Sequence, residues 1–117
     1  MEQELLFNRM KEIKDYYVKT AVKALNPDAD LIWSDFEDAY KALSSMIHTP
    51  EEKEAYTKVM NELFKYLLHS LLVMIDGEDS LHEKLQLDLI DKGTGESMKG
   101  SGSLNEGFMN YLAEHEA

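Results

Sequence analysis

Histidine and carboxylate side chains are the groups in this sequence that could bind a metal ion or transfer protons. Cysteine is absent, and the histidines are His48, His69, His82 and His115. A carboxylate-bridged di-metal bundle needs Glu-x-x-His on two helices, and a zinc protease helix needs His-Glu-x-x-His. Neither pattern occurs, and the nearest match, Asp79-x-x-His82, falls in an expected loop. We therefore predict no metal site and no cofactor.

The acidic turn that begins at Asp76 is the second candidate for ion binding. A calcium loop has glycine at its sixth position and glutamate at its twelfth, whereas here Gly77 is second and Leu87 is twelfth. We interpret the turn as a helix end followed by a solvated loop. In an alternative hypothesis, His69, His82 and this turn line the cleft of a small-molecule or metal-binding enzyme.

Glycine-rich residues 93–102 have the composition of a phosphate-binding loop but not its pattern. That loop ends in Gly-Lys-Ser or Gly-Lys-Thr, and here Gly100 is followed by Ser101. The Gly-x-Ser-x-Gly turn that carries the nucleophile of many hydrolases does not occur in the sequence either. No catalytic residue is predicted, and an enzymatic function is the less favoured hypothesis.

The spacing of apolar residues predicts the first and third helices. In residues 2–25 they recur three or four positions apart, which is the pattern of an amphipathic helix. A third helix begins with Thr49 as cap, Pro50 at its first position and Glu52 closing a capping box, and it ends before Gly77. Its C-terminal half is apolar nearly all round, which predicts a central helix that is covered on several sides.

The start of the second helix is open to two interpretations. An apolar stripe and early acidic residues predict a helix over residues 28–47. A capping box from Ser34 to Glu37 would start the helix later. We favour the earlier start, because the later one leaves residues 31–33, Leu-Ile-Trp, as an apolar loop.

The last third of the chain changes its pattern. Residues 84–89 alternate with period two, as in a half-buried strand, and residues 96–98 offer a short return strand. Residues 104–114 then predict a short helix with Ser103 as its cap. The predicted fold is mainly α, in the α+β class: a three-helix core with a central third helix, a small β-hairpin and a short C-terminal helix.

Length and hydropathy predict one soluble domain over residues 1–117. The acidic N-terminus lacks the apolar core of a signal peptide. The longest uncharged stretch, residues 66–75, is too short to span a bilayer. We therefore expect a cytoplasmic location and no membrane association.

The charge is strongly negative and unevenly distributed. The chain carries a net charge of −11. Residues 28–48 hold five acids and one base, and residues 76–117 hold ten acids and three bases. Such a surface repels nucleic acids and anionic membranes and attracts basic proteins. We expect no nucleic-acid partner and favour a basic protein.

Aromatic and acidic residues are interspersed in residues 28–48, and together they form the predicted protein-binding site. Aromatic anchors dominate the energy of many interfaces, while charge selects the partner. A competing interpretation places Phe36 and Tyr40 in the core and Trp33 at its margin. The predicted site residues are Asp30, Trp33, Asp35, Glu37 and Asp38.

Two further segments carry a resemblance to known proteins. Residues 64–77 form an apolar helical stretch that ends in Ile-Asp-Gly, and residues 102–108 read Gly-Ser-Leu-Asn-Glu-Gly-Phe. Together they resemble small acidic bacterial proteins of uncharacterised function, in which a short β segment separates two such helices. Some of these proteins resemble the immunity proteins of contact-dependent or polymorphic toxin systems. The resemblance covers about half of the chain and implies binding, with no catalytic residue.

The sequence thus favours a non-enzymatic acidic protein that binds a basic partner, in the manner of an immunity-type inhibitor. One alternative is the small-molecule or metal-binding enzyme described above. Another is a self-associating structural module. In that module the apolar third helix, or the strand at residues 85–89, would form a homodimer.

Overall fold

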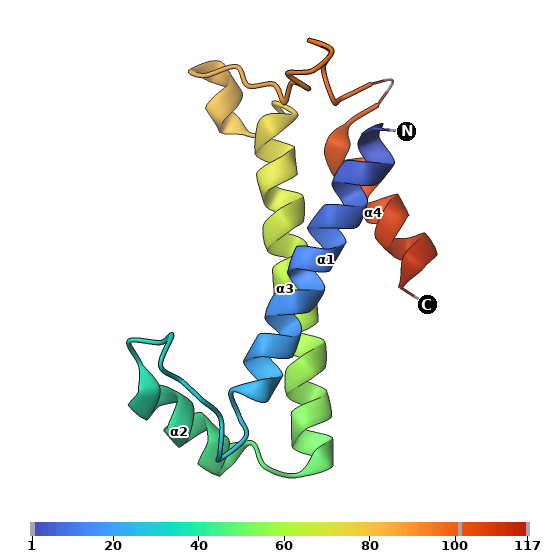
Figure 1. Ribbon diagram of the computed structural model, residues 1–117. Coiled ribbons are helices and arrows are strands. Elements are labelled where there is room, and N and C mark those ends of the chain that lie inside the picture. The colour runs from blue at the N-terminus through green and yellow to red at the C-terminus, as the bar shows by residue number, and fades with distance from the viewer. Residues whose placement is uncertain (1, 101, 117) are drawn as a thin grey trace. The chain divides into compact units, whose positions relative to one another are not determined.

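The structure is a computed structural model, and it describes residues 2–100 and 102–116. Within these residues the chain is mainly helical, as predicted (Figure 1). The elements are α1 (Glu2–Lys23), α2 (Glu37–Met46), α3 (Pro50–Ile75), the 3-10 helix η1 (Ser80–Glu83) and α4 (Leu104–His115). No helix of this described part is long and apolar enough to cross a membrane.

The chain forms two compact units, which are described separately. Unit 1 comprises Met1–Glu12 and Lys65–Ala117, and unit 2 comprises Ile13–Phe64. Because the division falls within α1 and α3, each of these helices contributes residues to both units.

The capping box predicted for α3 forms at its first turn. The Glu52 N–H donates to Thr49 Oγ1 at 3.1 Å, and the Thr49 N–H donates to Glu52 Oε1 at 2.9 Å. Pro50 is the first helical residue, where it loses no hydrogen bond. The backbone N–H of Thr49, followed by that of His48, holds the pKa of Glu52 below its ordinary value.

The C-terminal end of α3 is a glycine stop, also as predicted. Gly77 has a φ of +76°, a left-handed conformation that glycine adopts without strain. The Glu78 N–H donates to the Val73 carbonyl at 3.0 Å, and the Gly77 N–H donates to the Met74 carbonyl at 3.1 Å. These two bonds form a Schellman motif, which satisfies the last carbonyls of the helix.

The start of α4 is capped from two directions. Ser103 Oγ accepts from the Glu106 N–H at 3.3 Å, as the sequence predicts. In addition, the Asp76 carboxylate at the end of α3 accepts from the Leu104 N–H at 3.0 Å and the Asn105 N–H at 2.8 Å. The buried Asn105 side chain also donates to Asp76 at 2.7 Å. Asp76 therefore joins the end of α3 to the start of α4.

The core of unit 1 lies between α4, the N-terminal part of α1 and the end of α3, and Figure 1 shows α4 beside α1. The Phe7 and Phe108 rings are tilted, with centroids 5.8 Å apart. A Cβ at position 107 would lie 3.0 Å from the Phe7 ring, so Gly107 permits this close approach. The buried core residues are Phe7, Leu72, Leu104, Phe108 and Leu112.

The prediction that α3 is a covered, central helix is wrong. Leu72 is its one buried residue, at 3% exposure, whereas Leu67 is 58% exposed. Other large apolar side chains of α3 that remain exposed are Val59, Leu63, Tyr66 and Leu71. The described neighbours cover one side of this helix. Its other side is also apolar in sequence, but no described element packs against it.

Unit 2 has a smaller core with a buried charge. Val18, Leu25 and Leu31 are its larger buried apolar residues. The Lys14 side chain is fully buried, and its ammonium donates to Asp15 at 2.8 Å and to Asn61 at 2.6 Å. A buried ammonium needs such partners, because an unpaired charge is costly in a low-dielectric interior.

The predicted β-hairpin is absent from the described residues. In its place the chain forms one isolated antiparallel bridge between Ile90 and Ser97. Side chains take up neighbouring backbone groups: Asp88 accepts from the Leu89 N–H at 2.8 Å, and Lys99 donates to the Leu87 carbonyl at 2.8 Å. Such side-chain bonds compete with strand pairing, so the α+β part of the predicted fold class is unsupported.

Candidate protein-binding site

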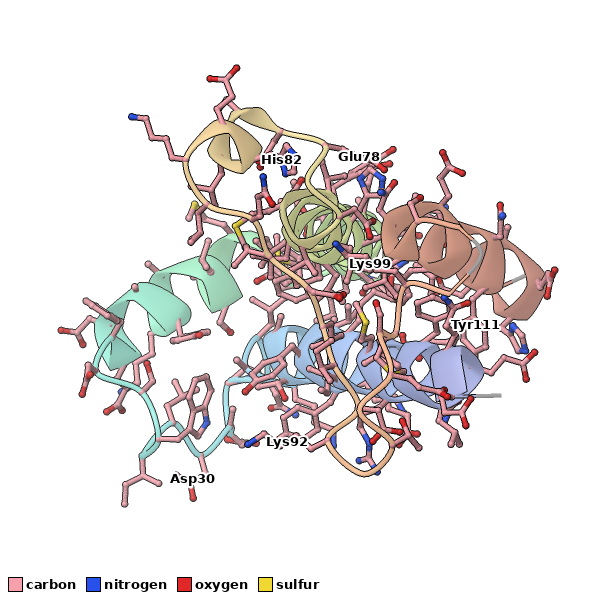
Figure 2. All side chains as sticks on the ribbon, turned by 90° about the horizontal axis from the view of Figure 1, so that it is seen from above. Asp30, Glu78, His82, Lys92, Lys99 and Tyr111 are labelled. Carbon is pink, nitrogen blue, oxygen red and sulfur yellow. The ribbon has the colours of Figure 1, made fainter. Side chains whose placement is uncertain are left out.

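The segment between α1 and α2 carries the predicted site residues, and its structure differs from the prediction. The second helix begins at Glu37 instead of residue 28. The late start does not come from the Ser34–Glu37 capping box, because Phe36 is the N-cap residue and makes no side-chain cap bond. Residues 30–36 therefore form the apolar loop that the favoured interpretation had rejected, and we call them the 30–36 loop (Figure 2).

A hydrogen-bonded turn forms the tip of the 30–36 loop. The Ser34 N–H donates to the Leu31 carbonyl at 2.9 Å, which places Ile32 and Trp33 at the two central positions of the turn. Leu31 is buried at the base of this turn. In this turn the buried Leu31 side chain is followed directly by the exposed side chains of Ile32 and Trp33.

Three large apolar side chains of the loop face solvent. Ile32 is 89% exposed, Phe36 is 70% exposed and Trp33 is 56% exposed. Large exposed apolar side chains that are grouped on one loop are typical of interaction surfaces. Ile32 and Phe36 were not among the predicted site residues, because a helix starting at residue 28 would have turned Phe36 toward the core.

Trp33 is exposed but not free to move. Its indole Nε1–H donates to the Asp30 carbonyl at 3.0 Å. Its ring also meets the Tyr40 ring of α2 edge-on, with centroids 5.4 Å apart at an interplanar angle of 68°. Both contacts fix the orientation of the ring while leaving much of its surface accessible.

Acidic residues surround these apolar side chains in the sequence. Residues 28–40 contain five acids and no base. Asp30, Asp35, Glu37 and Asp38 are all exposed. Glu37 pairs with Lys41 at 2.9 Å, and this hydrogen bond raises the pKa of Lys41. The remaining carboxylates give the loop a negative field that would draw basic groups toward it.

A surface hollow of about 570 Å³ lies beside the loop, between it and the C-terminal half of α1. Trp33 and Tyr16 supply aromatic lining, and Asp30 and Lys23 supply one charge of each sign. The hollow is large enough to accept side chains of a partner next to the loop. The structure thus brings Asp30 and Trp33 together at one edge, whereas Asp35, Glu37 and Asp38 extend the acidic surface toward α2.

The alternative site at the end of α3 has a structural role. Asp76 is engaged with the first turn of α4, and Asp79 accepts from the Leu81 N–H at 3.1 Å as the cap of η1. The side chain of His82 lies over Gly77, where a Cβ would be 2.7 Å from His82 Nδ1. Among the described residues, no group of three or more acidic or histidine side chains is arranged to hold a metal ion.

The glycine-rich segment near residue 95 is also unsuited to a phosphate. Its surroundings include a hollow of about 350 Å³ that is lined by the carboxylates Glu2, Asp91 and Glu96. Carboxylates repel phosphate oxygens. Ser101, part of the predicted glycine-rich segment, lies outside the described residues.

Comparison of the chain with protein-family models, curated proteins and solved structures finds no match.

Proposed function

We propose that this chain is a non-enzymatic, cytoplasmic binding protein that engages a basic protein partner through the 30–36 loop and the adjoining acids of α2. The observation that carries the proposal is the exposure of Ile32, Trp33 and Phe36 within a segment of five acids and no base. Apolar anchors supply most of the affinity of an interface, and complementary charge speeds the encounter and selects the partner.

An immunity-type inhibitor is the specific form of binding protein that we favour. The resemblance of residues 64–77 and 102–108 to small acidic bacterial proteins supports this form. A toxin gene beside the gene of this protein would support it independently. The basic partner would then be the toxin domain itself, held by the acidic loop.

Affinity capture with paired loop variants tests the proposal. One variant replaces Ile32, Trp33 and Phe36 by serine and keeps every acid. The second carries Asp35→Asn, Glu37→Gln and Asp38→Asn and keeps the apolar side chains. We expect a basic protein to be retained by the wild type and lost by both variants, and to be released between about 0.05 M and about 0.5 M salt.

A charge-matched variant controls for the overall negative charge. Glu51→Gln, Glu54→Gln and Glu62→Gln remove three exposed acids of α3 and leave the loop intact. This variant should retain the partner. In a purified complex, Trp33→Ala alone should weaken binding by about 30-fold or more, as for an interface anchor. Capture of the same proteins by the wild type and both loop variants would refute the proposal.

Self-association is a second candidate, favoured by the open side of α3. In unit 1 this side consists of Tyr66, Leu67, Ser70 and Leu71, all of which are exposed and none of which is charged. Two copies with a net charge of −11 each repel one another, and an uncharged face is where they could still meet. Sedimentation velocity at about 10 to 100 µM, a range set by weak dimer affinities, should then show a dimer that Leu67→Glu dissociates. A monomer throughout this range removes this candidate.

A further inference from the structure

The side chain and the backbone of Asp30 each hold one part of the 30–36 loop. Asp30 Oδ1 accepts from the Ile32 N–H at 3.0 Å. The Asp30 carbonyl accepts from the indole N–H of Trp33 at 3.0 Å. One residue thus contacts both residues at the tip of the turn. Figure 2 shows Asp30 on this loop, ahead of α2.

The rest of the loop is ordered in the same local way. The Phe36 N–H donates to Ser34 Oγ at 3.0 Å, and the Ser34 N–H donates to the Leu31 carbonyl at 2.9 Å. The amides of residues 32, 34 and 36 therefore all have acceptors within the loop. A loop held in this way presents its exposed side chains in one arrangement before a partner arrives, so less conformational entropy is lost on binding.

We infer that Asp30 is a positioning residue and not a partner contact. Its carboxylate holds the Ile32 N–H and so fixes the turn in which its backbone carbonyl accepts from the Trp33 indole. This inference rests on the proposed function. It also defines the partner surface more closely. Protruding side chains on an ordered turn require an apolar pocket, and the acids Asp35, Glu37 and Asp38 require lysine or arginine at the rim of that pocket.

The two roles of an aspartate, charge and hydrogen-bond acceptor, can be separated by substitution. Asp30→Asn removes the charge and keeps an Oδ1 acceptor for the Ile32 N–H. Asp30→Ala removes both. Asp35→Asn removes one charge from the same loop and is the matched control, and Ser34→Ala removes the other side-chain acceptor of the loop.

Trp33 is the one tryptophan of the chain, so its fluorescence reports on the loop in the free protein. Time-resolved anisotropy and quenching by acrylamide measure the mobility and accessibility of its ring. We expect Asp30→Ala and Ser34→Ala to increase the fast anisotropy component and the quenching constant. Asp30→Asn and Asp35→Asn should match the wild type. Far-UV circular dichroism identifies any variant that fails to fold.

Two results in the free protein would overturn the inference. One is a Trp33 signal that is unchanged in Asp30→Ala. The other is an Asp30→Asn protein as mobile as Asp30→Ala, which would assign the effect to charge. Because no partner is needed, this measurement decides the inference even where the capture experiment refutes the proposed function.

Dissociation kinetics of the captured complex extend the test to binding. Loss of one loop hydrogen bond in Asp30→Ala should raise the dissociation rate by about two- to twelve-fold. Asp30→Asn should lower the association rate by the same factor as Asp35→Asn and leave dissociation unchanged. Equal dissociation rates for Asp30→Ala and Asp30→Asn would contradict a positioning role.

Discussion

Removal of the Asp76 carboxylate should destabilise the fold, because it breaks the contact between the end of α3 and the start of α4. This carboxylate accepts three hydrogen bonds from the start of α4: from the N–H of Leu104, and from the N–H and side-chain amide of Asn105. Asp76→Ala leaves all three donors without this acceptor. The Asn105 amide keeps one bond, to Glu78 at 3.1 Å.

The cost follows from these contacts. Loss of a capping acceptor costs about 1 kcal/mol for each backbone N–H, and loss of a partner for a buried amide adds about 1–2 kcal/mol. We therefore expect Asp76→Ala to lower the free energy of unfolding by about 3–4 kcal/mol. Asp76→Asn should cost about 2 kcal/mol, because its NH₂ group must face at least one N–H donor.

Urea unfolding followed by far-UV circular dichroism measures these differences, and the thermal midpoint should fall by about 12–16 °C for Asp76→Ala. Glu78→Gln is the control, since it removes a neighbouring charge but keeps an oxygen for Asn105. A loss below about 1 kcal/mol in Asp76→Ala, the worth of one typical hydrogen bond, would refute the reasoning. It would mean that water replaces the carboxylate at little cost.

Three further predictions concern the other contacts of the fold. The hydrogen bond from the backbone N–H of Thr49 is the largest cause of the lowered folded-state pKa of Glu52. The stabilisation that ionised Glu52 gives to the fold is therefore present above the unfolded pKa and is lost as the pH falls through the folded pKa. The melting temperature of the wild type should therefore exceed that of Glu52→Gln at pH 7, and this difference should disappear as the pH falls from about 5 to about 3. Phe108→Ala should lower the free energy of unfolding by about 3–5 kcal/mol, whereas Leu67→Ala, at an exposed position, should change it by less than about 0.5 kcal/mol; similar losses in urea unfolding would contradict the burial pattern. Because α1 and α3 serve both units, urea transitions followed by Trp33 fluorescence and by circular dichroism should coincide; separate midpoints would refute the prediction of a single domain.

Local signals in the sequence were sufficient to place the ends of α3 and the start of α4. Thr49, Glu52 and Ser103 bond to backbone groups within three residues, and Gly77 adopts its own left-handed conformation. Interactions over so short a distance depend little on the rest of the fold. For that reason the sequence pattern and the structure agree at these positions.

The predictions of a covered α3 and of a helix that starts at residue 28 are wrong because residues distant in sequence decide both features. An apolar helix such as α3 can be covered or open, and which of these occurs depends on how many neighbours reach it. In the same way, the 30–36 loop is fixed partly by the burial of Leu31 and by the contact of Trp33 with Tyr40. Helical periodicity in residues 28–36 carried no information on these contacts.

The candidate site was predicted in part. Asp30 and Trp33 were selected for charge and aromatic character, while their mutual hydrogen bond depends on the turn between them. Ile32 and Phe36 were missed because a helical interpretation hides them. The apolar run at residues 31–33 was the available signal, since an apolar loop that remains exposed is itself evidence of a binding surface.

The hydrogen bonds from the first turn of α4 to Asp76 bring together the two ends of the connection formed by residues 77–103. Because its ends are fixed by side-chain and backbone contacts, the loop-closure entropy depends weakly on its length. Insertions would be tolerated best in its exposed turns, because Leu89 and Met98 pack against the core of unit 1. A single protease cut within this connection would leave α4 attached to the rest of unit 1 by the Asp76 hydrogen bonds and by its buried core side chains.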